Sequence, residues 1–233
     1  MQSDDTEQCI HNDQFHYRVD KGDGASDEFV ILLHGSGGNE DTLIDFARSI
    51  WPHATLIGVR GRVVQNGEVR WFKKITPTKF DQVDAIKEAD AFAKFLPDLF
   101  SHIGCNGSNV TFLGYSNGAN LLAILLLKYP HLIMRAILLR SMMVLDNVPQ
   151  NNLSHTHVLV VSGEKDSLYS RFAPTLSDCL KSNGADIKHC IVNTDHMIGA
   201  EDIKVVRQWL LGSEGLGSEG LSTEGLDTQG FDS

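Results

Sequence analysis

The segment NVTFLGYSNGAN, residues 109–120, places Ser116 between two glycines where one apolar run ends and another begins. This Gly-x-Ser-x-Gly pattern is typical of a nucleophile elbow, a tight turn that leaves the serine hydroxyl exposed above a sheet. Gly114 and Gly118 occupy the positions where a Cβ would collide with a neighbouring strand or helix. Serine is also a preferred helix N-cap, so the pattern by itself leaves both roles open.

An acyl-transfer nucleophile needs backbone N–H donors for the oxyanion that develops on the substrate carbonyl. The N–H of Asn117 opens the helix after the elbow and is one natural donor. The glycine-rich segment LLHGSGGN, residues 32–39, can hold the N–H of Ser36 or Gly37 toward the same point. Donors of this kind contribute roughly 3 to 4 kcal/mol each, although the segment is also compatible with an ordinary strand-to-helix turn.

A serine nucleophile also needs a base and an acid that orients the base. His196 follows the last apolar run, and Asp166 follows the run before it, which gives the chain order serine, acid, histidine. Glu164 and Asp195 are rival acids. Asp166 is favoured because a residue adjacent to a histidine usually points away from its ring, and because Glu164 would place a longer side chain in a tight turn.

Alternating apolar runs and helical periods indicate how these residues are positioned. Strands are predicted at 29–35, 54–59, 109–115, 135–140, 157–163 and 186–192. Helices are predicted at 39–50, 80–96, 118–129, 172–183 and 200–210. This alternation predicts an α/β fold with a mostly parallel sheet covered on both faces. Residues 15–22 suggest an antiparallel edge strand, and residues 60–80 form the longest irregular stretch.

Composition and net charge limit the kinds of molecule that the chain is expected to bind. The formal charge is −10 and the pI about 5.4, which argues against binding nucleic acid or anionic lipid. No apolar run reaches the roughly 18 residues that a membrane span needs, and the acidic N-terminus lacks the features of a secretory signal. Four cysteines at 9, 105, 179 and 190 show no zinc-ligand spacing, so we expect reduced thiols in a cytoplasmic protein.

The C-terminal residues differ in character from the rest. A four-residue unit of the type Ser-Glu-Gly-Leu occurs four times, at five-residue intervals, between residues 213 and 231. Units with one apolar residue each cannot bury a core, so we predict a disordered, acidic, glycine-rich tail over 212–233. Residues 1–211 are predicted to form one α/β domain, with its core from about residue 29.

Five segments in this order resemble the compact carboxylesterase/phospholipase branch of the α/β-hydrolases, which includes acyl-protein thioesterases and small bacterial carboxylesterases. They are LLHGSGGNEDTLIDFA, RGRVVQNGEVRWF, GYSNGAN, SGEKD and DHMIGAEDIKVVRQWL, and the resemblance spans about residues 29–211. It implies an α/β-hydrolase fold without a large lid. Carried over by position, it assigns the following roles: Ser116 as nucleophile, Asp166 as acid, His196 as base, and Ser36 and Asn117 as oxyanion donors.

The resemblance also places Trp71, Phe72 and Met142, with Met143, near the acyl pocket, although plain core packing explains these residues equally well. Asp195 departs from the family, which more often has glycine before the histidine. His155 and His157 suggest a metal pair only weakly, because no third ligand lies at useful spacing. His34 is expected to hold the glycine-rich turn through hydrogen bonds.

The function expected from these residues is hydrolysis of small or medium carboxylic esters or thioesters through an acyl-enzyme. This chemistry needs no cofactor and no metal. Amidase or peptidase activity is a rival, because the triad does not exclude amides. A receptor that binds a small ligand in a hydrolase pocket without turnover is a rival of another class. The chain has no predicted nucleic-acid partner, and a homodimer is left open.

Overall fold

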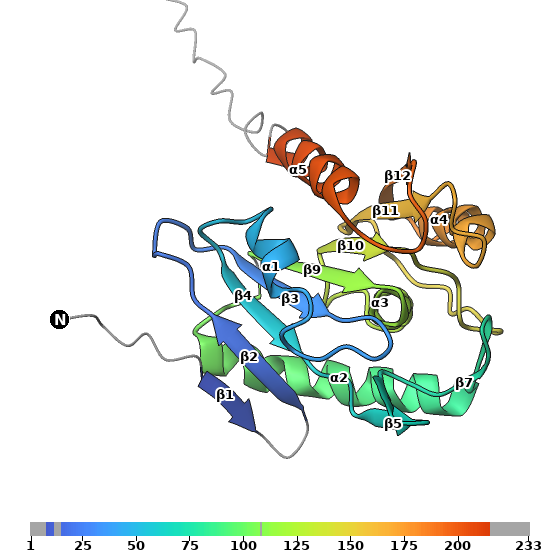
Figure 1. The fold of residues 1–233 in the computed structure, drawn as a ribbon, viewed down its shortest axis with the longest axis horizontal. Helices are drawn as coiled ribbons and strands as arrows, with labels where there is room; N and C mark the ends of the chain where they lie inside the picture. Colours follow the sequence, from blue (N-terminus) through green and yellow to red (C-terminus); the bar gives the residue numbers. More distant parts are fainter. Residues whose placement is uncertain (1–7, 12–14, 108, 215–233) are drawn as a thin grey trace, which may run out of the picture.

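The computed structural model describes residues 8–11, 15–107 and 109–214. A central sheet of eight strands lies between two layers of helices (Figure 1). Its strands in spatial order are β1 (Gln8–His11), β2 (His16–Asp20), β4 (Thr55–Val59), β3 (Phe29–Leu33), β9 (Val110–Tyr115), β10 (Arg135–Leu139), β11 (His157–Gly163) and β12 (Asp186–Val192). The strands from β4 to β12 are parallel, whereas β1 and β2 are antiparallel additions at one side.

The central strands are buried on both faces because helices cover both sides of the sheet. Residues of β3, β9, β10 and β11 are almost all buried, which explains why they appear in the sequence as continuous apolar runs. The register pairs Leu33 with Gly114 and Leu139 with Tyr115. The carboxyl ends of β3, β9 and β10 therefore meet at one edge of the sheet.

The helices divide between the two faces (Figure 1). They are α1 (Ile44–Arg48), α2 (Gln82–Ile103), α3 (Asn117–Lys128), α4 (Ala173–Ser182), which follows the 3-10 helix η1 (Ser170–Phe172), and α5 (Ala200–Glu214). One core cluster joins α2, α3 and α4 to the sheet, and a second joins α1 and α5 to its other face. Buried residues occupy every turn of α3, as expected for a helix packed between the sheet and α2.

The structure corrects two predicted elements. The stretch from 60 to 80 is not irregular, because it contains one hairpin of β5 (Val63–Gln65) and β6 (Glu68–Arg70) and another of β7 (Lys74–Thr76) and β8 (Lys79–Phe80). Asn66 and Gly67 both have positive φ, as a two-residue hairpin turn requires. The strand within 15–22 is β2, which is antiparallel but interior, since β1 pairs outside it.

Helix boundaries also differ from the predictions. The helix predicted from residue 39 begins only at Ile44, because the side chains of Asn39 and Thr42 hydrogen-bond within the preceding turn. Helix α2 continues to Ile103, and α5 continues to Glu214, past the predicted start of the tail. The rest of that tail lies outside the described residues.

Two further observations concern membrane-spanning helices and cysteines. Within the described ranges, no helix is both long and apolar enough to cross a bilayer. Cys105, Cys179 and Cys190 are free thiols.

Candidate active site

Ser116 adopts a backbone conformation that few non-glycine residues tolerate. It follows β9 and precedes α3 with φ 52° and ψ −113°, and such geometry costs on the order of 1 to 3 kcal/mol. A Cβ on Gly118 would lie 2.2 Å from the carbonyl oxygen of Leu33, and one on Gly114 would lie 2.7 Å from Cα of Ala119. Both glycines therefore permit the close approach of strand and helix that holds the strained turn.

A continuous chain of hydrogen bonds joins Ser116, His196 and Asp166. Nε2 of His196 lies 2.9 Å from Oγ of Ser116, and Nδ1 lies 2.7 Å from Oδ2 of Asp166. An ionised carboxylate only accepts hydrogen bonds, so Nδ1 carries the proton and Nε2 is left to accept the serine proton. Asp166 is 2% exposed, whereas the imidazole of His196 is 32% exposed at the mouth of the site.

The loop after β11 holds the carboxylate of Asp166 in place. Its second oxygen accepts the backbone N–H groups of Leu168 and Tyr169, both at 3.0 Å. The rival acids lie elsewhere. Glu164 is exposed, and the side chain of Asp195 accepts the N–H of Met197 at 2.8 Å within its own loop.

Arg140 anchors the loop that carries His196, a role that sequence reasoning missed. Its buried guanidinium forms an ion pair with the buried carboxylate of Asp202 at 2.8 and 3.0 Å. It also donates to the carbonyl oxygens of Asp195 at 2.9 Å and Met197 at 3.0 Å, the residues on either side of His196. An arginine directly after the buried strand RAILL was the available signal, since arginine is rarely buried without a specific partner.

Two tyrosines complete the surroundings of the imidazole. Tyr115 donates its hydroxyl proton to the carbonyl oxygen of His196 at 3.1 Å, with the two ring centroids 5.6 Å apart. Tyr169 packs edge-on against the imidazole at 5.1 Å. Burial raises the pKa of both phenols, so they remain protonated donors at neutral pH. Neither tyrosine was singled out from sequence.

The oxyanion side is built from β3 and the elbow. Gly35 lies against the nucleophile, because a Cβ on it would lie 3.6 Å from Cβ of Ser116 and 2.8 Å from the ring of Tyr115. Of the two predicted donors in this turn, Gly37 is already engaged, since its N–H donates to the carbonyl oxygen of Val69 at 2.8 Å. The N–H of Ser36 has no backbone acceptor among the described residues, and its role as an oxyanion donor stays a prediction.

Asn117 occupies the first position of α3, where backbone N–H groups have no partner within the helix. Its side chain fixes the neighbouring hairpin, because Oδ1 accepts the N–H of Trp71 at 2.8 Å. The structure thus places the backbone of Asn117 beside the elbow and ties it to the segment that follows β6.

His34 connects the turn after β3 to the segment between β4 and β5. Its Nδ1 donates to the carbonyl oxygen of Gly35 at 2.6 Å, and its Nε2 accepts the N–H of Gly61 at 2.9 Å. Burial lowers the pKa of His34, so the ring is neutral with the proton on Nδ1. The indole N–H of Trp71 donates to the carbonyl oxygen of His34 at 2.9 Å.

The three residues predicted to line the acyl pocket are all buried in the larger core cluster. Trp71 lies beneath the oxyanion turn against His34, with ring centroids 5.3 Å apart. Phe72 packs against Phe80, and Met142 donates its N–H to Asn120 Oδ1 at 2.8 Å. Their role in binding stays a prediction.

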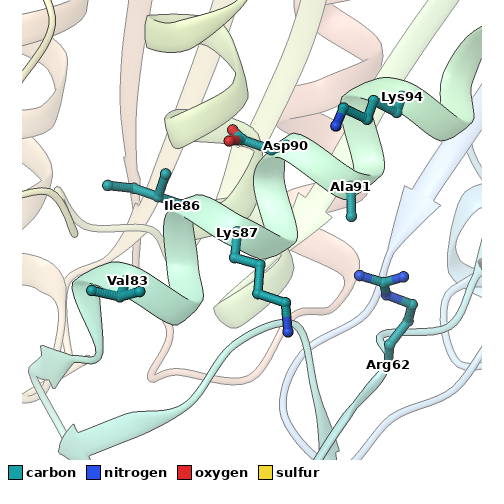
Figure 2. Close-up of a pocket in the computed structure, with 7 residues that line it drawn as sticks. All are labelled: Arg62, Val83, Ile86, Lys87, Asp90, Ala91 and Lys94. Atoms are coloured by element: carbon teal, nitrogen blue, oxygen red, sulfur yellow. The ribbon is translucent and has the colours of Figure 1, made fainter.

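Other potential sites lie apart from the triad. Within the ranges that the structure describes, no three His, Cys, Asp or Glu side chains converge as metal ligands. His157 instead pairs with Asp186 at 3.0 Å. Figure 2 shows a groove along α2 that contains none of the triad residues. It is lined by Arg62, Val83, Ile86, Lys87, Asp90, Ala91 and Lys94.

Comparison with known proteins identifies the family of the chain. The model of the phospholipase/carboxylesterase family matches residues 15–211. The putative hydrolase MhqD of Bacillus subtilis is 32% identical over 187 residues, which cover 80% of this chain and 94% of MhqD.

Solved structures give the same result. A carboxylesterase from Mesorhizobium loti is 42% identical, with a TM-score of 0.86 over 88% of this chain and 99% of its own. The Bacillus cereus carboxylesterase is 28% identical, with a TM-score of 0.82 over 87% of this chain and 96% of its own. The predicted fold and family are confirmed, and the chain belongs to the phospholipase/carboxylesterase family of the α/β-hydrolases.

Proposed function

We propose that the chain hydrolyses carboxylic esters or thioesters through an acyl-enzyme on Ser116, with His196 as base and Asp166 as orienting acid. Family membership supports ester hydrolysis as the general activity. The observation that carries the mechanism is the hydrogen-bonded chain from Ser116 Oγ through His196 to Asp166, at 2.9 and 2.7 Å.

The first half of the reaction transfers the acyl group to the enzyme. Ser116 Oγ attacks the substrate carbonyl carbon while its proton passes to Nε2 of His196. The resulting oxyanion is bound by the N–H groups of Ser36 and Asn117. When the tetrahedral intermediate collapses, His196 returns the proton to the leaving alcohol or thiol, and the acyl group remains on Ser116.

The second half repeats these steps with water as nucleophile. His196 takes a proton from water, the hydroxide attacks the acyl carbonyl, and the acid is released as Ser116 recovers its proton. Asp166 stays ionised throughout and stabilises the imidazolium that forms twice in each cycle. No metal or cofactor takes part in any of these steps.

Hydrolysis of a p-nitrophenyl ester series from acetate to decanoate tests the proposal. We expect Ser116→Ala to lower kcat/KM by on the order of 10³ or more, and Ser182→Ala, which removes an exposed hydroxyl on α4, to leave it unchanged. Matched oxygen and sulfur esters of the preferred acid would separate esterase from thioesterase activity. Equal rates in wild type and Ser116→Ala would contradict the proposal, and binding without turnover would favour a receptor.

A further inference from the structure

Arg70, at the end of β6, is a buried cation whose hydrogen-bonding capacity is incompletely used. Its side chain is only 3% exposed, and Nε donates to the carbonyl oxygen of Phe72 at 3.3 Å. Nη1 is buried and makes no hydrogen bond. The nearest carboxylate on Nη1 is that of Glu68, at 3.6 Å, and the Glu68 side chain is 53% exposed. Burying a guanidinium with such weak pairing is costly, so a further acceptor is expected.

Arg70 lies next to the catalytic machinery. The following residue, Trp71, donates its N–H to the side chain of Asn117 at 2.8 Å. The positive charge of Arg70 also acts on Tyr169. Burial raises the pKa of this phenol, and the guanidinium of Arg70 partly offsets that rise. The phenol is close enough to Ser116 for the serine hydroxyl to affect the same pKa. Arg70 and Ser116 therefore both lie near Tyr169.

Two further donors beside the nucleophile have no acceptor. Nδ2 of Asn117 and Nδ2 of Asn120 are both buried and form no hydrogen bond in the structure. Asn120 lies one helical turn after Ser116 and also influences the pKa of Tyr169. With Nη1 of Arg70, these make three buried donors that form no hydrogen bond among the described residues, although the amide of Asn120 is close enough to the phenol of Tyr169 to lower its pKa. Buried polar groups are rarely left unpaired, and an excess of donors is met by a ligand rich in acceptor oxygens.

We propose that Arg70, assisted by the side-chain amide of Asn120, binds a carboxylate on the acyl portion of the substrate. This inference rests on the proposed function and names its substrate class: monoesters or monothioesters of short dicarboxylic acids. A carboxylate fits because it is planar and supplies two acceptor oxygens, the geometry that a guanidinium recognises best. The exposed side chain of Glu68 moves aside when the substrate carboxylate binds.

The acyl portion is assigned to this side because the leaving group must depart past His196. That imidazole protonates the leaving group and is partly exposed, and the neighbouring Met197 is 66% exposed. Arg70, Asn120 and Tyr169, in contrast, are all buried. The acyl group, which remains on Ser116 while the leaving group diffuses away, is therefore the part of the substrate held on the buried side.

The test compares two esters with the same acyl chain that differ in charge. One is the mono-p-nitrophenyl ester of glutarate, and the other is the same compound with its free carboxylate capped as a methyl ester. The measured quantity is the ratio of kcat/KM for the acidic ester to kcat/KM for the capped ester, after subtraction of the rate without enzyme. The adipate pair repeats the comparison at a longer spacing.

We expect wild type to prefer the acidic ester by about 10-fold or more, and Arg70→Met to lower the ratio by on the order of 100-fold. Arg70→Lys, which keeps the charge but loses the planar fork, should give an intermediate ratio. The control is Arg135→Met, which removes an arginine at the amino end of β10 and should not change the ratio. Free glutarate should also raise the Tm of wild type and of Ser116→Ala, but not that of Arg70→Met.

A wild-type ratio at or below one for both ester pairs would overturn the proposal, as would an Arg70→Met ratio within about threefold of wild type. If Arg70→Met does not fold, the proposal is judged by two other measurements. These are the kcat/KM ratio of wild type and the Tm shift that glutarate causes in Ser116→Ala. If neither ester is hydrolysed, the proposed function fails. The glutarate shift still tests the carboxylate site, and its absence in wild type overturns this inference separately.

Discussion

The two sides of Ser116 are held by different forces. On the side of the base, the loop bearing His196 is fixed by charge, since the buried ion pair of Arg140 and Asp202 binds the backbone on both sides of the imidazole. On the oxyanion side, the neutral ring of His34 and closely packed glycines hold the turn. One side is held by a buried ion pair, and the other by a neutral ring and close backbone packing.

The chemistry of each side explains the difference. His196 must gain and lose a proton in every cycle, so its loop has to reach solvent and still return the ring to one position. The proposed oxyanion side must present backbone N–H groups at a fixed point, and a Cβ on Gly35 or Gly118 would collide with the ring of Tyr115 or the carbonyl oxygen of Leu33. Substitutions around the loop of His196 should therefore misplace the imidazole. Substitutions at the glycines of the oxyanion side should instead disturb the close packing of the turn.

The largest effect is expected from the acid. Asp166→Asn should lower kcat by on the order of 10³ to 10⁴, because an amide no longer favours the tautomer with the proton on Nδ1 of His196. Asp195→Asn is the matched change on the adjacent residue, and it should alter kcat by less than about threefold, since that carboxylate bonds to Met197. Steady-state kinetics on one ester measures both. Comparable losses in the two variants would mean that the acid is misassigned.

On the oxyanion side, Gly118→Ala should lower kcat/KM by on the order of 10² or more and destabilise the fold by about 3 kcal/mol, because the new methyl would lie 2.2 Å from the carbonyl oxygen of Leu33. Gly212→Ala is the control, since a Cβ there meets nothing within 4 Å on the exposed end of α5. It should stabilise the protein by up to ~1 kcal/mol. Urea unfolding and ester kinetics report the two effects. A fully active Gly118→Ala would refute the packing argument.

On the side of the base, Arg140→Met should destabilise the protein by about 3 to 5 kcal/mol, because it leaves the buried carboxylate of Asp202 unpaired. The double variant Arg140→Met with Asp202→Leu should recover most of this stability. Its kcat should nevertheless remain reduced by about 10-fold or more, since the loop around His196 has lost its anchor. Recovery of kcat together with stability would show that Arg140 does not position the base.

The smallest effect concerns pH and His34. Burial lowers the pKa of His34 in the folded protein, so the unfolded chain binds a proton first as pH falls below about 6.5. The contribution of neutral His34 to the free energy of unfolding should be fully present above that pH. Below it, this contribution should fall by up to about 1.4 kcal/mol per pH unit. His34→Gln should weaken this dependence, and the exposed-site control His131→Gln should not. Urea unfolding at pH 7.5 and 5.5 makes the comparison, and equal slopes in all three proteins would contradict it.

The sequence predicts the central strands and the order of the triad residues because parallel strands leave long apolar runs and because functional loops follow their carboxyl ends. The hairpin at Asn66 and Gly67 was missed, although Asn-Gly is a strong turn signal. The late start of α1 was missed because local side-chain bonds at Asn39 compete with the helix. Arg140 was missed although it directly follows a buried strand, and Arg70 could not be placed, because only the folded chain shows that this arginine is buried.

Covalent labelling of the nucleophile tests the central claim most directly. Intact-mass and peptide mass spectrometry after reaction with a fluorophosphonate should show one adduct per chain, on Ser116, formed in parallel with the loss of esterase activity. His196→Ala should label far more slowly, because the serine then lacks its base. An adduct on another residue, or full activity in a protein labelled at Ser116, would contradict the account.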